Sequence, residues 1–288
     1  MSWLEFPAAE NQPTQKKLLE QNPDAVYLAS DLIRKELYGS ESITGDKNKV
    51  FRLLHSRVKE ELKKDKTVIF DATNLTRKAR RNAFEDAKGP VIKEVHIVWA
   101  PIHACIDRDK KRTRVVGRKD IMRLATGFQA PWWDEGMDTI KIIVTHPPHN
   151  YTRYINRCKR DMQIPHDNPY HSLSVWDHCV AARVHAIDAH YPETVIYAAL
   201  FHDIGKPITK TFREDPKTGN QIAHYYQHDN IGGWMAYGIT SDPEQAIELA
   251  WLIGNHMQPY FNTKYYQNLD PRYRELIDQL HDCDVQAH

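Results

Sequence analysis

Apolar residues in the first half of the chain form short β-branched runs separated by longer stretches. These runs predict buried strands at residues 25–29, 67–70, 95–99 and 140–144. One stretch between them carries apolar residues at helical spacing and predicts a helix over residues 48–64, through Val50, Leu54, Val58 and Leu62. Because strands that alternate with helices favour a mostly parallel sheet covered on both faces, we expect an α/β domain over residues 1–150.

The pattern changes in the second half of the chain. Residues 151–169 show little periodicity and contain Pro165 and Pro169, so we expect a linker there. Beyond it, apolar residues recur at helical spacing and alternating runs are scarce. The expected helices are 175–189, 193–204, 229–237, 243–253 and 271–285. Residues 170–288 are therefore expected to form an all-α bundle.

Charge divides the chain in the same way. Residues 1–160 carry 31 basic and 21 acidic side chains, whereas residues 161–288 carry 8 and 17. Eleven of the 16 histidines follow residue 160. This polarity favours a first half that meets a polyanion and a second half that holds cations. The four cysteines show no paired spacing, and no leader or membrane-spanning run is present, so we expect a soluble, cytoplasmic protein.

The most specific short motif is AALFHDIGKP, in which His202 and Asp203 end an apolar helical run and Lys206 follows. A buried carboxylate next to a histidine is costly without a cation or a hydrogen-bonded partner, and a metal ion supplies one. The spacing of His224 and His228 would direct both imidazoles the same way on a helical turn. The other candidates, in order along the chain, are His178, His256 and Asp284. His166, His190 and His281 are expected to be ordinary histidines.

These residues resemble the HD superfamily of metal-dependent phosphohydrolases, from His171 to the end of the chain. The resemblance implies an all-α HD bundle with two divalent metal ions, for which the residue types suit manganese, iron, nickel, zinc or magnesium. The ligands of one ion would be His178, His202, Asp203 and Asp284. Those of the second ion would be His224, His228 and His256.

In that family Lys206 would contact the scissile phosphate. His171 would lie near the phosphate, and it competes with His178 for the role of first metal ligand. We expect one metal ion to lower the pKa of a bound water, while the second ion and Lys206 neutralise the phosphate oxygens. Asp203, Lys206 and His171 are therefore the expected catalytic residues.

Three segments of the first half carry another resemblance. The segments NPDAVYLASDLIRKEL, TVIFDATNLTRKARR and the arginine-rich stretch before FQAPWWDEG resemble the P-loop kinase domain of polynucleotide kinases and zeta toxins. The resemblance implies that Asp31 is the general base and that Arg34 binds a neighbouring phosphate. It places Asp71 at a strand end near the site. The expected phosphate clamp is formed by Arg112, Arg114 and Arg118.

The phosphate-binding loop departs from that family. The family motif G-x-x-x-x-G-K-[ST] would fall at residues 5–12, which here read EFPAAENQ. Glu5 and Glu10 stand at the glycine positions, Asn11 at the lysine and Gln12 at the hydroxyl. Because this Walker A loop is degenerate, we do not expect it to bind ATP with magnesium. We also expect no efficient kinase activity. The domain would retain a basic surface that binds a polynucleotide or a nucleotide.

Three functions remain open on the sequence alone. In the first, the HD domain removes a 3′-phosphate or opens a 2′,3′-cyclic phosphate on nucleic-acid ends, while the basic half holds the strand. In the second, the HD domain hydrolyses small nucleotides. In the third, the chain is a nucleotide-sensing regulatory protein. The resemblance to chains that combine an HD phosphohydrolase with a polynucleotide kinase favours the first.

Overall fold

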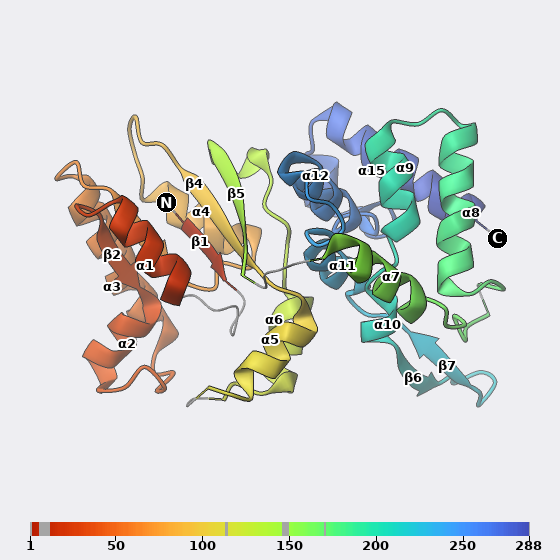
Figure 1. Cartoon of the computed structure of the whole chain (residues 1–288), viewed down its shortest axis with the longest axis horizontal. Coiled ribbons are helices and arrows are strands. Elements are labelled where there is room, and N and C mark those ends of the chain that lie inside the picture. Colours follow the sequence, from red (N-terminus) through yellow and green to blue (C-terminus); the bar gives the residue numbers. More distant parts are fainter. Residues whose placement is uncertain (1, 6–11, 113–114, 146–149, 170, 288) are drawn as a thin grey trace. The chain divides into compact units, whose positions relative to one another are not determined.

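The computed structural model of the chain consists of two units (Figure 1). Unit 1 contains Met1–Leu124 and Pro131–Pro147, and unit 2 contains Ala125–Ala130 and Pro148–His288. The structure describes residues 2–5, 12–112, 115–145, 150–169 and 171–287.

Unit 1 is built on a parallel sheet of five strands in the order β2-β3-β1-β4-β5. The α/β class and the four predicted strands are confirmed. A further strand, β1, is too short and too mixed in polarity to stand out in the sequence. The strands are β1 (Ser2–Glu5), β2 (Val26–Ala29), β3 (Val68–Asp71), β4 (Glu94–Trp99) and β5 (Thr139–Val144).

The helices of unit 1 pack on this sheet. The helix expected at 48–64 is α3 (Lys47–Leu62), which Asp46 caps by accepting hydrogen bonds from the Asn48 and Lys49 amides. The α3 helix buries one apolar stripe in a core that includes Val68 and Phe70 of β3. The other helices are α1 (Gln12–Gln21), α2 (Ser30–Tyr38), α4 (Arg77–Glu85), α5 (Ile102–Asp109) and α6 (Arg118–Thr126), with a 3-10 turn, η1 (Trp133–Glu135).

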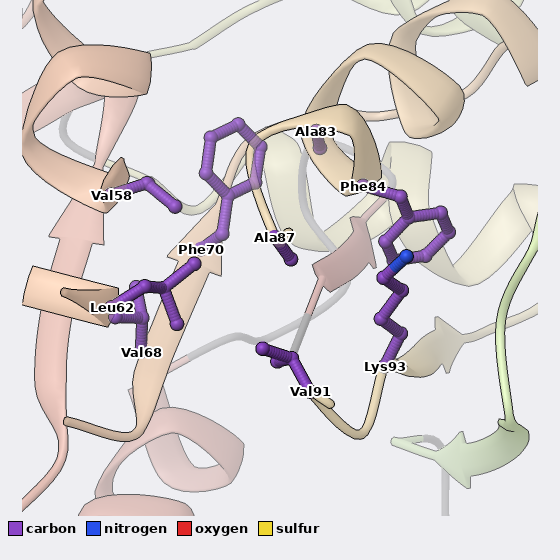
Figure 2. A pocket seen from close by; sticks show the side chains of 9 residues that line it. All are labelled: Val58, Leu62, Val68, Phe70, Ala83, Phe84, Ala87, Val91 and Lys93. Atoms are coloured by element: carbon purple, nitrogen blue, oxygen red, sulfur yellow. The ribbon is translucent and has the colours of Figure 1, made fainter. Parts of the chain in front are cut away.

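A small apolar cavity of about 30 Å³ lies between α3, α4 and the sheet. Figure 2 shows Ala87 lying between the Phe70 and Lys93 side chains. The remaining lining residues are Val58, Leu62, Val68, Ala83, Phe84 and Val91. The space is large enough for a water molecule or one or two methyl groups, but it offers little room for a ligand.

Unit 2 is mainly helical, as expected. Its major helices are α7 (Tyr151–Asp161), α8 (Val175–Asp188), α9 (Glu193–Phe201), α11 (His228–Ala236), α12 (Pro243–Ile253) and α15 (Pro271–Gln286). Its short helices are α10 (Lys206–Thr209), α13 (Gln258–Phe261) and α14 (Lys264–Gln267). Since no helix of the described ranges is both long and apolar enough, none of them could cross a membrane.

A β-hairpin interrupts the expected all-α pattern of unit 2. Strands β6 (Thr211–Glu214) and β7 (Gln221–His224) pair in antiparallel fashion. Their turn is fixed by Asp215, whose carboxylate accepts hydrogen bonds from the Lys217 amide and the Thr218 hydroxyl. Each strand has only four residues, and all four of β6 are exposed, so the sequence gives them no strong strand signal.

Two segments outside the expected bundle also belong to unit 2. The expected linker, residues 151–169, contains α7, whose Tyr154 and Cys158 side chains are buried. From the first half of the chain, Phe128 is fully buried against Trp234 and Tyr237, with ring centroids 5.3 Å and 6.2 Å away. Unit 2 therefore begins before the boundary expected at residue 170 and includes a short piece of the earlier sequence.

Candidate metal centre

The histidine and aspartate candidates of unit 2 lie at helix ends that converge in the interior. Asp203 directly follows His202 after α9, His228 begins α11, and His256 follows α12. His178 lies on α8, and Asp284 lies on α15. The side chains of His178, His202, Asp203 and His256 are no more than 2% exposed. Residues from distant parts of the sequence therefore form one buried polar cluster.

A first group surrounds one oxygen of Asp203. The Nε2 atoms of His178 and His202 are 3.2 Å apart. Asp203 Oδ2 lies 3.7 Å from His178 Nε2 and 3.4 Å from His202 Nε2. Asp284 Oδ1 lies 3.0 Å and 3.4 Å from the same two nitrogens. His178, His202 and Asp203 can together hold one metal ion, and Asp284 lies close enough to both histidines to be a fourth ligand.

A second group lies on the other oxygen of Asp203. The Nε2 atoms of His228 and His256 are 3.1 Å apart, and Asp203 Oδ1 is 3.3 Å from His228 Nε2. Asp203 thus contributes one carboxylate oxygen to each group. This arrangement can hold a second metal ion next to the first.

Backbone carbonyls orient the four histidines. Each Nδ1–H donates to a backbone oxygen, which leaves the Nε2 lone pair directed into the cluster. The four bonds are His178 to Ala287 (2.8 Å), His202 to Ala199 (2.9 Å), His228 to Tyr225 (2.8 Å) and His256 to Ile253 (2.7 Å). The Nε2 lone pairs of His178 and His202 face each other at 3.2 Å, and those of His228 and His256 at 3.1 Å. Each pair of nitrogens requires a cation or a proton between them. The residues present fit divalent metal ions.

The electrostatics of the cluster favour positive charge beside Asp203: burial lowers the pKa of His202, but the Asp203 carboxylate outweighs burial and holds it well above the usual value. Burial, and then the neighbouring His228 and His202, lowers the pKa of His256 to about 3, so that its ring is neutral and able to bind metal. Burial by itself would raise the pKa of Asp203, but Lys206 and His202 outweigh it and hold the pKa well below the usual value. Asp203 is therefore an anion at neutral pH, as a metal ligand must be.

Gly205 allows the two sides of the centre to approach closely. A Cβ atom at this position would lie only 2.1 Å from the backbone oxygen of His228. Because no side chain fits there, the glycine between Asp203 and Lys206 lets α10 pack directly against the start of α11. The Gly in the HDIGKP motif therefore has a steric role in bringing the two groups together.

Lys206 places a positive charge at the edge of the cluster. Its Nζ lies 2.5 Å from Asp203 Oδ2, 3.1 Å from His166 Nε2 and 3.4 Å from His171 Nε2. The His171 ring stacks on that of His178 with centroids 5.0 Å apart. The Nε2 atom of His178, and not that of His171, is in the first group, whereas His171 lies beside the lysine. The lysine and its imidazole neighbours form a site suited to an anion.

Two predicted roles need correction against this geometry. His224 ends β7 and His228 begins α11, so the two residues do not share a helical turn, and His224 belongs to neither group. The ring of His224 stacks instead on Tyr226. His166, expected to be ordinary, is buried and donates Nδ1–H to Leu173 O while Nε2 faces Lys206. Its position in the expected linker gave no signal of this role.

Tyr260 is a further residue that the sequence did not single out. Its hydroxyl donates to Asp284 Oδ2 over 3.1 Å, while Asp284 Oδ1 faces His178. Tyr260 therefore orients one carboxylate of the first group from outside it.

The candidates of unit 1 are held in a different way. Asp31, which follows β2, forms an ion pair with Arg34 on the same helix. Asp71, at the end of β3, accepts a hydrogen bond from the Tyr27 hydroxyl. Arg112 and Arg118 are exposed. Arg114 and residues 6–11 of the degenerate loop lie outside the described residues.

A buried ion pair supports the DATN segment of unit 1. Arg80 on α4 binds both oxygens of Glu135, at 2.7 Å and 2.6 Å, and neither side chain is exposed. Arg80 also donates to the backbone oxygen of Asn74. The spaced arginines after DATN therefore include one that is structural, a role that depends on a partner 55 residues away.

Comparisons with known proteins agree with this division. Residues 14–131 match the family model described as an AAA domain, and residues 170–283 match the model of the HD domain. A CC-adding tRNA nucleotidyltransferase of Thermus thermophilus is 32% identical over 99 residues, which are 32% of this chain and 22% of the relative. The chain thus spans about a fifth of that relative. It carries an N-terminal P-loop kinase-like domain of the AAA type and a C-terminal HD domain.

Proposed function

We propose that the protein is a metal-dependent phosphohydrolase that acts on nucleic-acid ends, as a 3′-phosphatase or a 2′,3′-cyclic phosphodiesterase. The observation that carries the proposal is the shared carboxylate of Asp203. Its two oxygens face two groups of histidine Nε2 atoms, and Lys206 lies 2.5 Å from one of them. A paired cation site with an adjacent ammonium group suits the hydrolysis of a phosphate ester.

The residues have distinct roles in this proposal. His178, His202 and Asp203, with Asp284 beside them, would hold one divalent ion, and His228, His256 and the second oxygen of Asp203 would hold another. When bound, the ions would supply a nucleophilic water of lowered pKa and neutralise phosphate charge. Lys206 binds a non-bridging phosphate oxygen, and His171 and His166 support its position. The attacking water would lose one proton to solvent, and the leaving oxygen would take one proton from solvent.

A nucleic-acid substrate agrees with two further features. Residues 1–160 carry 31 basic against 21 acidic side chains, and Arg112 and Arg118 are exposed. The name of the Thermus relative connects it with tRNA. In our proposal unit 1 holds the polyanion without transferring phosphate efficiently, because EFPAAENQ lacks the glycines, lysine and hydroxyl of a phosphate-binding loop. Binding should then weaken steeply as salt is raised.

The test is a metal-supplemented hydrolysis panel with the full chain. It would compare 3′-phosphorylated RNA, 2′,3′-cyclic-phosphate RNA and mononucleotides, each with manganese, iron, nickel, zinc or magnesium. Because ligand loss should exceed the effect of removing an outer neighbour, His202→Ala and Asp203→Ala should lower kcat/KM by more than about 100-fold. The matched controls are His190→Asn and Asp188→Ala, which change exposed residues of the same two types.

Several outcomes would contradict the proposal. Hydrolysis confined to mononucleotides would replace it with a small-nucleotide phosphohydrolase. Absence of hydrolysis with every metal, together with nucleotide binding, would favour a regulatory protein. Magnesium- and ATP-dependent 5′-phosphorylation of an oligonucleotide by the pure protein would overturn the inactive role given to unit 1.

A further inference from the structure

The β6–β7 hairpin leaves the metal centre and returns to it. It follows α10, which begins at Lys206, and it precedes α11, which begins at His228. Between these two residues the chain extends into solvent, and all of β6 is exposed. The hairpin is therefore an exposed extension whose two ends are fixed by residues of the candidate centre.

One face of the hairpin carries planar and cationic side chains. The register pairs Thr211 with His224 and Arg213 with Ile222, so Arg213 and His224 share a face. The rings of His224 and Tyr226 are parallel to within 3°, with centroids 5.4 Å apart. The Arg213 guanidinium carbon lies 4.9 Å from the centroid of the Tyr226 ring. We call Arg213, His224 and Tyr226 the hairpin platform.

The platform remains accessible although its members contact one another. Tyr226 is 54% exposed although its ring contacts both His224 and Arg213. Stacked rings with an adjacent guanidinium form a surface to which another flat, electron-rich group can be added. Burial of the remaining ring surface would stabilise such a complex.

The base of the hairpin is fixed to the anion-binding part of the centre. Asp167 accepts hydrogen bonds from the Ala223 amide at 2.8 Å, through its backbone oxygen, and from Lys210 Nζ at 2.6 Å, through its carboxylate. The Tyr225 hydroxyl donates to the backbone oxygen of His166. The Tyr225 ring lies 5.4 Å from Lys206 Nζ. The residue whose ring lies beside Lys206 therefore stands directly between two platform residues, His224 and Tyr226, in the sequence.

We propose that the hairpin platform binds a base of single-stranded nucleic acid next to the phosphate that the metal centre cleaves. The inference rests on the proposed function, since it assigns Lys206 and the metal groups to that phosphate. Tyr226 would stack on a base, and Arg213 would contact the ring or a backbone phosphate. Stacking of this kind accepts every base, so the platform selects for a single strand and not for a sequence.

The hairpin supplies its own control. Phe212 is also 54% exposed, but the alternation of side chains places it on the opposite face of β6. Tyr226→Leu and Phe212→Leu therefore remove aromatic rings of equal exposure from the two faces. Loss of base stacking is worth about 1–3 kcal/mol per base, which corresponds to about 5- to 150-fold in affinity.

Two measurements on the full chain separate this inference from the proposed function. The first is the affinity for a labelled single-stranded RNA with a 3′-phosphate, by fluorescence anisotropy. We expect Tyr226→Leu to weaken binding by about 5-fold or more, and Phe212→Leu to change it by less than about 2-fold. The second is metal-dependent hydrolysis of glycerol 2-phosphate, which has neither a base nor any other aromatic ring. Tyr226→Leu should leave that activity unchanged.

The possible results have separate meanings. Binding that depends on Tyr226, without hydrolysis of any ester, would reject the proposed function and retain the platform. Hydrolysis of 3′-phosphorylated RNA with equal affinities for the wild type and both variants would reject the platform alone. An equal loss in the two variants, or a loss of glycerol 2-phosphate hydrolysis in Tyr226→Leu, would also overturn it, since neither result is specific to base stacking.

Discussion

Charged side chains have different kinds of partner in the two units. In unit 1, Arg80 binds Glu135 through two hydrogen bonds, and Asp31 pairs with Arg34. In unit 2, Asp203 lies within 3.8 Å of the Nε2 atoms of four histidines. A protein ion pair satisfies both partners, whereas converging lone pairs need a cation. The centre of unit 2 is therefore organised for a ligand, whereas Arg80 and Glu135 in unit 1 hold the structure of that unit.

The contrast teaches that similar residue types near a motif can have different roles. The arginines after DATN and the histidines around HD both appear in the sequence as spaced polar residues within apolar surroundings. Among the arginines, Arg80 is neutralised by the carboxylate of Glu135, which lies far away in the sequence. The histidines are instead oriented by backbone carbonyls that leave Nε2 available. What distinguishes them is the partner, and the partner is set by the fold.

The largest expected effect would come from breaking the buried pair of unit 1. Arg80→Met leaves the Glu135 carboxylate buried without its partner, which should lower the free energy of unfolding of unit 1 by about 3–5 kcal/mol. Urea denaturation of the full chain, followed by circular dichroism, measures this change. Arg81→Met is the matched control, because Arg81 is 46% exposed and pairs with Asp134 at 3.3 Å. We expect it to cost less than about 1 kcal/mol.

A double variant tests whether the unpaired Glu135 carboxylate causes this loss of stability. Replacement of both members, as in Arg80→Met with Glu135→Leu, removes the charge that would otherwise be stranded, so much of the lost stability should return. If Arg80→Met were no more destabilising than Arg81→Met, the pair would not hold the DATN segment. Arg80 and Glu135 would then not be an ion pair that stabilises unit 1.

A smaller effect is expected from the outer neighbour of the metal centre. Tyr260→Phe removes the hydroxyl that donates to Asp284 Oδ2 while the ring is kept. Because such neighbours orient a ligand, the affinity for a divalent metal should fall by about 10- to 100-fold. Isothermal titration with manganese after chelation would measure it.

The control for Tyr260 uses a second tyrosine that donates to a carboxylate of α15, the helix that carries Asp284. Tyr266→Phe removes a hydroxyl that bonds to Asp278, which belongs to neither metal group. We expect manganese affinity to be unchanged in that variant. Equal affinities of Tyr260→Phe and the wild type would mean that Asp284 needs no support, or that it is not a ligand of the ion.

Local signals in the sequence were enough for much of this picture. The strands of unit 1 and α3 were predictable because apolar runs and helical spacing need only neighbouring residues. The sequence motif also identified residues that the structure places together, namely His178, His202, Asp203, His228, His256 and Asp284. These predictions depend on residue type and on apolar segments that fix where each side chain points.

The features that escaped prediction depend on distant partners. Tyr260 and His166 act through contacts with Asp284 and Lys206, which no local pattern records. His224 was misplaced because a spacing of four carries meaning only within a helix, and a strand ends there. The hairpin itself has strands too short for a period-two signal. Tertiary contacts, and not composition, decide these cases.

The smallest expected effect comes from the cavity of unit 1. Ala87 lines a space of about 30 Å³ with Phe70 and Phe84, and the surrounding residues are apolar apart from Lys93 (Figure 2). Ala87→Val adds two methyl groups where there is room for them. We expect the free energy of unfolding to rise by about 0.5–1 kcal/mol, less than full burial of both groups would give, because Ala87 is only half-buried.

The same substitution at a filled position should have the opposite sign. Ala104 on α5 is 5% exposed and does not line the cavity, so Ala104→Val should be destabilising by about 1–3 kcal/mol through overpacking. Urea denaturation of the two variants beside the wild type gives both values. A loss of stability in Ala87→Val would mean that the space closes in solution. Unit 1 would then be packed as tightly as the region around Gly205 in unit 2, where an added Cβ has no room.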